Sequence, residues 1–381
     1  MKLAITLFHY FPYGGLERDM LAVVRACQQR GHEVTIYTRE WQGDIPADLA
    51  VVLLPTSGIS NHQRAKIFAA RCAQAIPVDS DVIIGFNKMP GLDVYFAADT
   101  CFAQKVYEER NWFYRWSSRS RAFLTMERAV FDASGNTEIL LISPAQKLAF
   151  QHYYQTPDSR LHLLPPGVKR DRVMPPDYDH QRQQVRMSMG VSDDHYVMLM
   201  IGSDFKRKGL ARSLRALASL PLELKARCQL WVAGQDDAAP YLRLAQQLGV
   251  AEHLVILGAR DDIPSLLWSA DVLLHPAHSE AAGAVLLEAM VAGLPVIASD
   301  VCGYAHYINT WQMGKVLSSD DIDTQLAAAI IDIAAQDSDE WRAHAHKFIE
   351  QADTFDMHEK IVAIIEAMGT KSLGKSNHSD L

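Results

Sequence analysis

The chain has 381 residues, a length that suits two domains of about 150–200 residues each. Hydrophobic residues make up 49% of it and charged residues 22%, as in an ordinary soluble globular protein. The formal net charge of −8 argues against a nucleic-acid-binding protein, because such proteins usually carry a basic total charge. The five cysteines form no C-x-x-C pair, so the sequence predicts neither a zinc site nor a disulfide framework.

The sequence also bears on the cellular compartment. The first apolar run, KLAITLF, is too short for the hydrophobic region of a signal peptide. No stretch approaches the roughly 18 apolar residues of a membrane-spanning helix. We therefore expect a cytoplasmic protein, in keeping with its scattered, unpaired cysteines.

Short apolar runs alternate with helical stretches along most of the chain. Several runs are continuously apolar, as expected of strands buried on both faces of a parallel sheet. The first set of expected strands is 3–8, 33–38, 50–55, 82–86, 95–98, 139–143 and 161–164. The second set is 197–202, 230–233, 255–257, 272–275 and 296–298. This alternation predicts doubly wound α/β units.

The segment LLPPGVKRDRVMPPDYDHQ interrupts the pattern, because its four prolines and its charges suit neither a core strand nor a helix. It predicts two Rossmann-like domains, 1–166 and 167–345, facing each other across a cleft. A last helix is expected over 340–368, and the polar residues 369–381 are expected to be disordered. Ligands of open α/β sheets bind outside the carboxyl ends of the strands, so we expect the sites just after strands.

The first candidate motif, FPYGGLERD, follows the first expected strand. Gly14 and Gly15 would let the backbone turn tightly and approach a ligand before a helix begins at about Leu16. Asp19 is expected on the first turn of that helix, where it could act on a substrate or simply interact with the helix amides. The dinucleotide fingerprint G-x-G-x-x-G is absent, which argues against a dehydrogenase.

The second motif, GSDFKRKGL, follows the first strand of the second set. Arg207 and Lys208 are expected in a loop at the carboxyl edge of the sheet. Two adjacent cations there suit a diphosphate, which Arg binds as a fork and Lys as a point charge. The alternative is a solvated loop without a ligand.

The third motif, HSEAAGAVLLEAMVAGLPV, contains Glu280 and Glu288. On one helix their spacing gives about 80° of rotation and about 12 Å of rise. That separation exceeds the roughly 5–5.5 Å of a retaining glycosidase pair. It suits one elongated ligand, with Glu280 at the sugar and Glu288 at a ribose diol. The small residues Ala281, Ala282 and Gly283 would expose helix amides to a phosphate. Alternatively, Glu288 forms a structural salt bridge.

Together these motifs resemble the donor-binding pattern of family-four glycosyltransferases. Glu-x7-Glu lies within SEAAGAVLLEAMVAGLPVIASDVCGY, and FPYGGLERD, RGHEVTIYT and GSDFKRKG precede it in the matching order. NKMPGLDVYFAAD and VCGYAHYI are similar to the lipopolysaccharide core glucosyltransferases of that family. The resemblance covers nearly the whole chain except the last dozen residues. It implies the α/β fold called GT-B and a retaining, metal-independent hexosyltransferase without a cofactor.

The resemblance also implies partners and residue roles. The donor would be UDP-glucose, and the acceptor an inner-core heptose of lipopolysaccharide on the cytoplasmic face of the inner membrane. Donor contacts are implied for Gly14, Gly15, Arg172, Arg207, Lys208, Glu280, Ala281, Ala282, Gly283 and Glu288. Asp19 and Asp99 would line the acceptor side near the reacting carbon, and Glu280 would contact the donor sugar. A helix at 346–368 would cross back to the N-terminal domain.

The segment at about 101–131 mixes basic and aromatic side chains, which is typical of an interfacial membrane segment. The residues expected to contact an anionic membrane are Lys105, Arg110, Trp112, Arg115, Trp116, Arg119 and Arg121. The alternative is a partly buried helical excursion. We expect a peripheral monomer that binds no nucleic acid.

Other functions remain open from the residues alone. A GT-B transferase could use another UDP-hexose or a UDP-N-acetylhexosamine, because Ala281 and Ala282 leave room for either. A GT-B nucleotide-sugar epimerase would need no lipid acceptor, which leaves the basic aromatic segment without a purpose. A non-catalytic adaptor would not need the charged motifs. The four Asp-x-Asp pairs do not lie beside the donor motifs, so we expect no metal site.

Overall fold

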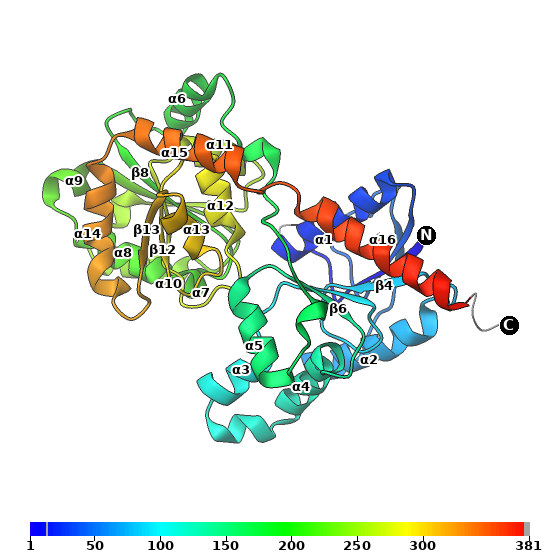
Figure 1. Cartoon of the computed structure of the whole chain (residues 1–381). Helices are drawn as coiled ribbons and strands as arrows, with labels where there is room; N and C mark the ends of the chain where they lie inside the picture. Colours follow the sequence, from blue (N-terminus) through cyan, green and yellow to red (C-terminus); the bar gives the residue numbers. More distant parts are fainter. Residues whose placement is uncertain (13, 377–381) are drawn as a thin grey trace. The chain divides into compact units, whose positions relative to one another are not determined.

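The computed structural model describes residues 1–12 and 14–376, with the backbone alone described at 145 and 371–376 (Figure 1). The chain divides into two compact units. Unit 1 is Met1–Pro165 together with Asp356–Leu381, and unit 2 is Pro166–Phe355. Each unit is built on one parallel sheet, which confirms the predicted doubly wound α/β class.

Unit 1 contains a seven-stranded parallel sheet in the order β3-β2-β1-β4-β5-β6-β7. The order reverses between β1 and β4, and such a switch point is where ligands of open α/β sheets bind. The central strands are almost wholly buried, as their continuous apolar sequences predict. The strands are β1 (Lys2–Leu7), β2 (Glu33–Thr38), β3 (Ala50–Leu53), β4 (Val82–Gly85), β5 (Val94–Ala97), β6 (Glu138–Leu141) and β7 (Leu161–Leu163).

Helices cover the sheet of unit 1, and the last helix of the chain packs against the first (Figure 1). Arg30, at the end of α1, pairs with Glu359 and Glu366 of α16. The helical elements are α1 (Gly15–Gln29), α2 (Asn61–Ala75), α3 (Phe102–Gln104), the π-helix η1 (Lys105–Glu109), the 3-10 helix η2 (Trp112–Trp116), α4 (Ser118–Phe131), α5 (Pro144–Tyr154), η3 (Asp158–Arg160) and α16 (Met357–Ser376).

Unit 2 contains a six-stranded parallel sheet in the order β10-β9-β8-β11-β12-β13, and its order reverses between β8 and β11. The strands are β8 (Tyr196–Ile201), β9 (Cys228–Ala233), β10 (Leu254–Gly258), β11 (Val272–His275), β12 (Val296–Ser299) and β13 (Gly314–Leu317). The helical elements are η4 (Arg170–Arg172), α6 (Tyr178–Ser188), α7 (Phe205–Lys208), α8 (Leu210–Ala218), α9 (Leu222–Arg227), α10 (Ala239–Gln247), η5 (Ala251–His253), α11 (Ile263–Ser269), α12 (Ala284–Val291), α13 (Ala305–Thr310), α14 (Ile322–Ala334) and α15 (Ser338–Gln351).

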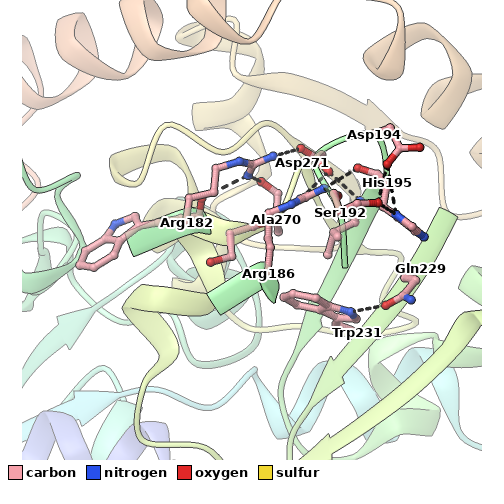
Figure 2. Close-up of polar contacts among 12 residues, drawn as sticks. Arg182, Arg186, Ser192, Asp194, His195, Gln229, Trp231, Ala270 and Asp271 are labelled. Carbon is pink, nitrogen blue, oxygen red and sulfur yellow. Dashed lines mark hydrogen bonds and ion pairs between the residues drawn. The ribbon is translucent and has the colours of Figure 1, made fainter. Parts of the chain in front are cut away.

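A partly buried ionic network ties α6 to the amino-terminal edge of this sheet. Figure 2 shows Arg182 and Arg186 directed at Asp271, which directly precedes β11. Arg182 Nη2 and Arg186 Nη1 lie 2.5 and 3.3 Å from the Asp271 carboxylate, which also accepts the amide of Val197 at 2.6 Å. Arg186 is 1% exposed and donates to the carbonyl of His195 at 2.6 Å. This network lies at the edge opposite the carboxyl ends of the strands, so we assign it to stability.

Two expectations for the end of the chain are wrong. The single helix expected over 340–368 is two helices, α15 and α16, separated at residues 352–356. Thr354 in this break is fully buried, and its carbonyl accepts the amide of Val168 at 2.9 Å. The chain therefore rejoins unit 1 at Asp356, not at 346.

The second wrong expectation is disorder over residues 369–376, the described part of the polar tail. Helix α16 continues to Ser376, and residues 377–381 lie outside the described part. Ile361, Val362 and Ile365 are buried and fix the start of the helix. Once a helix is nucleated, each further residue adds one hydrogen bond, so it can extend into a polar stretch.

Candidate functional site

The carboxyl edge of the unit 2 sheet brings the second and third motifs together. Arg207 and Lys208 follow β8, and Glu280 follows β11, its neighbour across the switch point. The expected loop around Arg207 is instead the one-turn helix α7. Asp204 caps this turn, because its side chain accepts the amide of Arg207 at 3.2 Å.

Glu280 is the centre of a charged cluster in unit 2. Its Oε2 lies 3.0 Å from Nη1 of Arg207 and also contacts Nζ of Lys208. Nε2 of His275 is 3.5 Å from the same oxygen. The side chains of Glu280 and Lys208 are each 12% exposed, whereas that of Arg207 is 39% exposed. One carboxylate thus holds two cations, of which Arg207 is the more accessible.

The surroundings of Glu280 keep it ionised. Burial alone would raise its pKa, but the adjacent His275 ring and the charge of Lys208 outweigh burial and lower the pKa. Burial lowers the pKa of His275, so this ring is neutral at pH 7. Among the described residues neither ring nitrogen of His275 has a partner that meets hydrogen-bond geometry. The cluster therefore carries two cations and one carboxylate at neutral pH.

The backbone around Glu280 differs from the expectation of one continuous helix. Glu280 forms an isolated bridge with Cys302, and α12 begins only at Ala284. Gly283 takes a left-handed φ of 83°, a conformation that suits glycine. Because this φ is not helical, α12 cannot extend back beyond Ala284. Ala281 and Ala282 thus precede the helix, and the carbonyl of Ala282 accepts the amide of Tyr304 at 2.8 Å. The helical spacing between Glu280 and Glu288 does not apply.

Glu288 and Arg172, both expected at the donor, contact each other. Nε of Arg172 lies 3.4 Å from Oε2 of Glu288, and both side chains are 7% exposed. Arg172 also pairs with Asp171 at 2.8 Å. This is the structural salt bridge that the sequence left open for Glu288. A ribose contact for Glu288 stays a prediction.

In unit 1 the helix that follows Gly14 carries Glu17, which was not among the candidate residues predicted from the sequence. Gly14 precedes α1 in an extended conformation, and a Cβ there would overlap the carboxylate of Glu17. Gly15 has open space around it. Glu17, not Asp19, is the acidic residue of the first turn, so the expected place of Asp19 is wrong. The signal was a glutamate three residues after the helix cap, a known capping position.

Burial gives Glu17 unusual acid–base behaviour. The residue is 5% exposed, and this burial, with the nearby charges of Asp19 and Asp99, raises its pKa to about 7. Asp19 is half-buried and Asp99 is exposed. The structure thus places the two expected acceptor-side aspartates close enough to Glu17 to interact electrostatically.

A cavity of about 640 Å³ lies at the carboxyl edge of the unit 1 sheet. Asp99 lines it, and the backbone carbonyl of Asp99 accepts the side-chain amide of Gln146 at 3.0 Å. The other lining residues are Phe8, His9, Arg39, Glu40, Pro55, Thr56, Asn61, Arg64, Asn87, Arg119 and Phe123. Except for Asp99 and the membrane candidate Arg119, the sequence reasoning missed these residues, although several directly follow predicted strands.

The segment 101–131 combines a partly buried helix with an exposed aromatic turn. Helix α4 is a partly buried excursion, anchored by the fully buried Glu127. The preceding η2 exposes Trp112, Phe113 and Trp116 by 59%, 68% and 70%. Arg110 and Arg115 stack on Tyr114 and Tyr107, with the guanidinium carbons 5.6 and 5.1 Å from the ring centroids.

Three of the expected membrane residues lie elsewhere in this segment. Arg119 and Lys105 line a smaller cavity of about 300 Å³ that shares Asp99 with the larger one. Arg121 is exposed on α4. Across residues 1–12 and 14–376, no helix is long and apolar enough to cross a membrane, and no group of three or more acidic, His or Cys side chains could hold a metal ion.

Comparisons with known proteins cover both units. Residues 13–172 match the family model described as Glycosyltransferase Family 4, and residues 181–355 match the model described as Glycosyl transferases group 1. The lipopolysaccharide glucosyltransferase WaaG of Escherichia coli K12 is 39% identical over 368 residues, which are 96% of this chain and 98% of that protein.

Solved structures agree with the sequence matches. A crystal structure of WaaG, described as a glycosyltransferase involved in lipopolysaccharide biosynthesis, gives a TM-score of 0.88 and covers 95% of this chain and 99% of that one. Anabaena HepE in complex with UDP-glucose gives 0.69 at 16% identity, covering 99% and 100% of the two chains. This last likeness concerns the fold alone.

Proposed function

The chain belongs to the family-four glycosyltransferases of the GT-B class, and from this premise we propose that it transfers glucose from UDP-glucose to an inner-core heptose of lipopolysaccharide. The observation that carries the proposal is the 39% identity, over 96% of the chain, to a lipopolysaccharide glucosyltransferase. The anomeric configuration of the sugar would be retained.

The charged cluster of unit 2 suits the donor. Arg207 and Lys208 both contact Glu280, so their positions are fixed by the protein. The diphosphate of UDP would take over part of the contact that Arg207 and Lys208 make with Glu280. A carboxylate oxygen of Glu280 would then be available to accept a hydrogen bond from a hydroxyl of the donor sugar. As the bond to the sugar breaks, negative charge grows on the diphosphate, and the two cations would stabilise it without a metal ion.

We propose that the exposed aromatic side chains of η2 place the enzyme on the cytoplasmic face of the inner membrane. Trp112, Phe113 and Trp116 are largely exposed, and Arg110 and Arg115 lie among them. Indole and phenyl rings partition into the headgroup region, and arginines attract anionic lipids. A lipid-linked acceptor would then be held in the same plane as the enzyme, which would act as a peripheral monomer.

The test is transfer by the purified chain to lipopolysaccharide truncated after its heptoses. We expect incorporation of one hexose from UDP-glucose in the presence of EDTA, with an α-linkage by NMR. Preference for UDP-galactose or UDP-N-acetylglucosamine would reject the donor. A β-linkage would reject retention, and activity that needs added manganese would reject metal independence. Epimerised nucleotide-sugar without transfer would replace the proposal with the epimerase alternative.

A further inference from the structure

The large cavity of unit 1 lies where four neighbouring strands end. Phe8 and His9 follow β1, and Arg39 follows β2. Asn87 and Asp99 lie just beyond β4 and β5, on the other side of the switch point. This is the edge at which an open parallel sheet binds its ligand, and its volume of about 640 Å³ is that of a small-molecule site.

Three arginines line this cavity, and none forms a salt bridge with any residue that the structure describes. Nε of Arg39 donates to the carbonyl of Phe8 at 2.9 Å, and its guanidinium lies 4.9 Å from the Phe8 ring centroid. Nε of Arg64 donates to the carbonyl of Gly58 at 2.9 Å. Arg119 lies over the ring of Phe123 at 5.7 Å. Neutral partners thus orient the three side chains, and no direct ion pair occupies their guanidinium groups.

Neighbouring groups add to the positive potential. Helix α2 begins at Asn61, which also lines the cavity, so the positive end of its dipole faces the same space. Burial and the charge of Arg64 lower the pKa of Arg39. Burial and the charge of Arg39 lower the pKa of His9, which is therefore neutral at pH 7. Two carboxylates, Glu40 and Asp99, line the cavity as well, so its three arginines outnumber its acidic side chains.

We propose that this cavity binds an anionic group, a phosphate or a carboxylate, carried by the acceptor sugar, with Arg39, Arg64 and Arg119 as its cationic ligands. This inference rests on the proposed function and names the chemical class of its acceptor. Guanidinium groups bind both oxyanions through paired hydrogen bonds. Asp99 offers an acceptor for sugar hydroxyls. Asn87, whose side-chain oxygen already accepts the amide of Phe8 at 2.6 Å, offers its amide nitrogen as a donor, and the Phe8 and Phe123 rings offer apolar faces to a sugar ring.

The test is calorimetric titration of the full chain with three probes: mannose 6-phosphate, glucuronate and uncharged methyl α-mannoside. We expect at least one charged sugar to bind about tenfold or more tightly than methyl α-mannoside. The preferred charged probe distinguishes phosphate from carboxylate. Equal affinity for all three sugars would overturn the proposal.

Variants connect the affinity to the arginines. Arg64→Gln and Arg119→Gln should each weaken binding of the preferred charged sugar by about tenfold. Lys66→Gln, an equal charge loss at an exposed residue of α2 outside the cavity, should not. Unchanged affinity in both arginine variants would overturn the proposal.

Titration of the same variants with UDP separates this inference from the donor site. We expect unchanged UDP affinity, whereas weaker UDP binding in Arg64→Gln would assign the cavity to the donor and overturn the proposal. A chain that binds the charged sugar through these arginines but transfers no glucose would refute the proposed function and leave the anion site standing.

Discussion

At the scale of single residues, Lys208 and Arg207 share one carboxylate oxygen of Glu280 but differ in exposure. The side chain of Lys208 is 12% exposed, so its charge acts in a less polar environment than that of Arg207. Charges placed in such surroundings before reaction are the most effective stabilisers of a leaving group. Lys208 is therefore the cation whose removal should lower the rate of glucose transfer most.

We predict that Lys208→Met lowers kcat for glucose transfer by about 100-fold or more. The variant removes a fixed positive charge from the diphosphate and leaves the Glu280 carboxylate with one cation fewer. Steady-state kinetics with UDP-glucose measure the effect. Lys206→Met is the matched control, because Lys206 is an exposed neighbour on the same helical turn. Equal activity of the two variants would contradict the prediction.

Glu17 gives a prediction on stability. Its pKa is raised to about 7 in the folded chain, against an ordinary value of 4.5. Between these pH values the unfolded chain has released the proton and the folded chain keeps it, so stability falls as pH rises. Glu17→Gln removes this loss. Its stability relative to the wild type should rise by up to about 3 kcal/mol from pH 4.5 to pH 8.

Urea unfolding at the two pH values measures this difference. The exposed Asp44→Asn has the same change of formal charge and serves as the control, because it removes no buried carboxyl group. A constant difference between Glu17→Gln and the wild type at both pH values would show that folding does not raise the pKa of Glu17.

The residue scale also shows what a sequence can and cannot predict. Arg207, Lys208 and Glu280 were expected at one site because each follows a strand of the same parallel sheet, and the structure brings them into contact. Glu17 was missed because its character comes from burial. The pairing of Glu288 with Arg172 joins residues 116 positions apart, and spacing along the chain contains no sign of such a contact.

At the scale of elements, η2 concentrates exposed aromatic area on one short turn. We predict that the double variant Trp112→Ala/Trp116→Ala weakens binding to vesicles of anionic phospholipid by at least about tenfold, because two indoles no longer enter the headgroup region. Vesicle sedimentation measures the loss. UDP affinity should be unchanged, since the cluster that we propose binds the donor lies in unit 2.

The control for this experiment is Val78→Ala, which shortens a fully exposed apolar side chain outside η2. Vesicle binding that survives in the double variant would refute the role of η2. An equal loss in the control would point instead to a general dependence on exposed apolar surface.

The secondary-structure elements show where the spacing of apolar residues is enough to predict a strand or a helix. Twelve of the strands were predicted, because short continuous apolar runs in an α/β protein are typical of buried strands. Strand β13 was missed, since Gly314 and Lys315 give this short edge strand no apolar run. Helix α7 was expected as a loop, because one turn is too short for a helical period. The break at 352–356 depends on a bond from Val168, far away in the sequence.

At the scale of the whole molecule, α16 returns the end of the chain to unit 1. The family resemblance implied this return. The pattern of residues could not predict it, because contacting residues such as Arg30 and Glu366 are 336 positions apart. The start of unit 2 at Pro166 is different. Prolines cannot continue a strand or a helix, so the sequence itself indicates that division.

Because α16 completes unit 1, a defect in it should lower the stability of that unit and spare the donor site that we propose in unit 2. Ile365 is fully buried on α16, and its replacement by Ala leaves a cavity that costs about 2–5 kcal/mol. Ala363→Ser, at an exposed position of the same helix, is the control. We expect thermal unfolding followed by hydrogen exchange to show earlier opening of residues 1–165 in Ile365→Ala, while residues 166–355 and UDP affinity keep their wild-type values. Loss of UDP affinity together with early opening of both ranges would mean that the two units unfold as one, and that the end of the chain stabilises the entire enzyme.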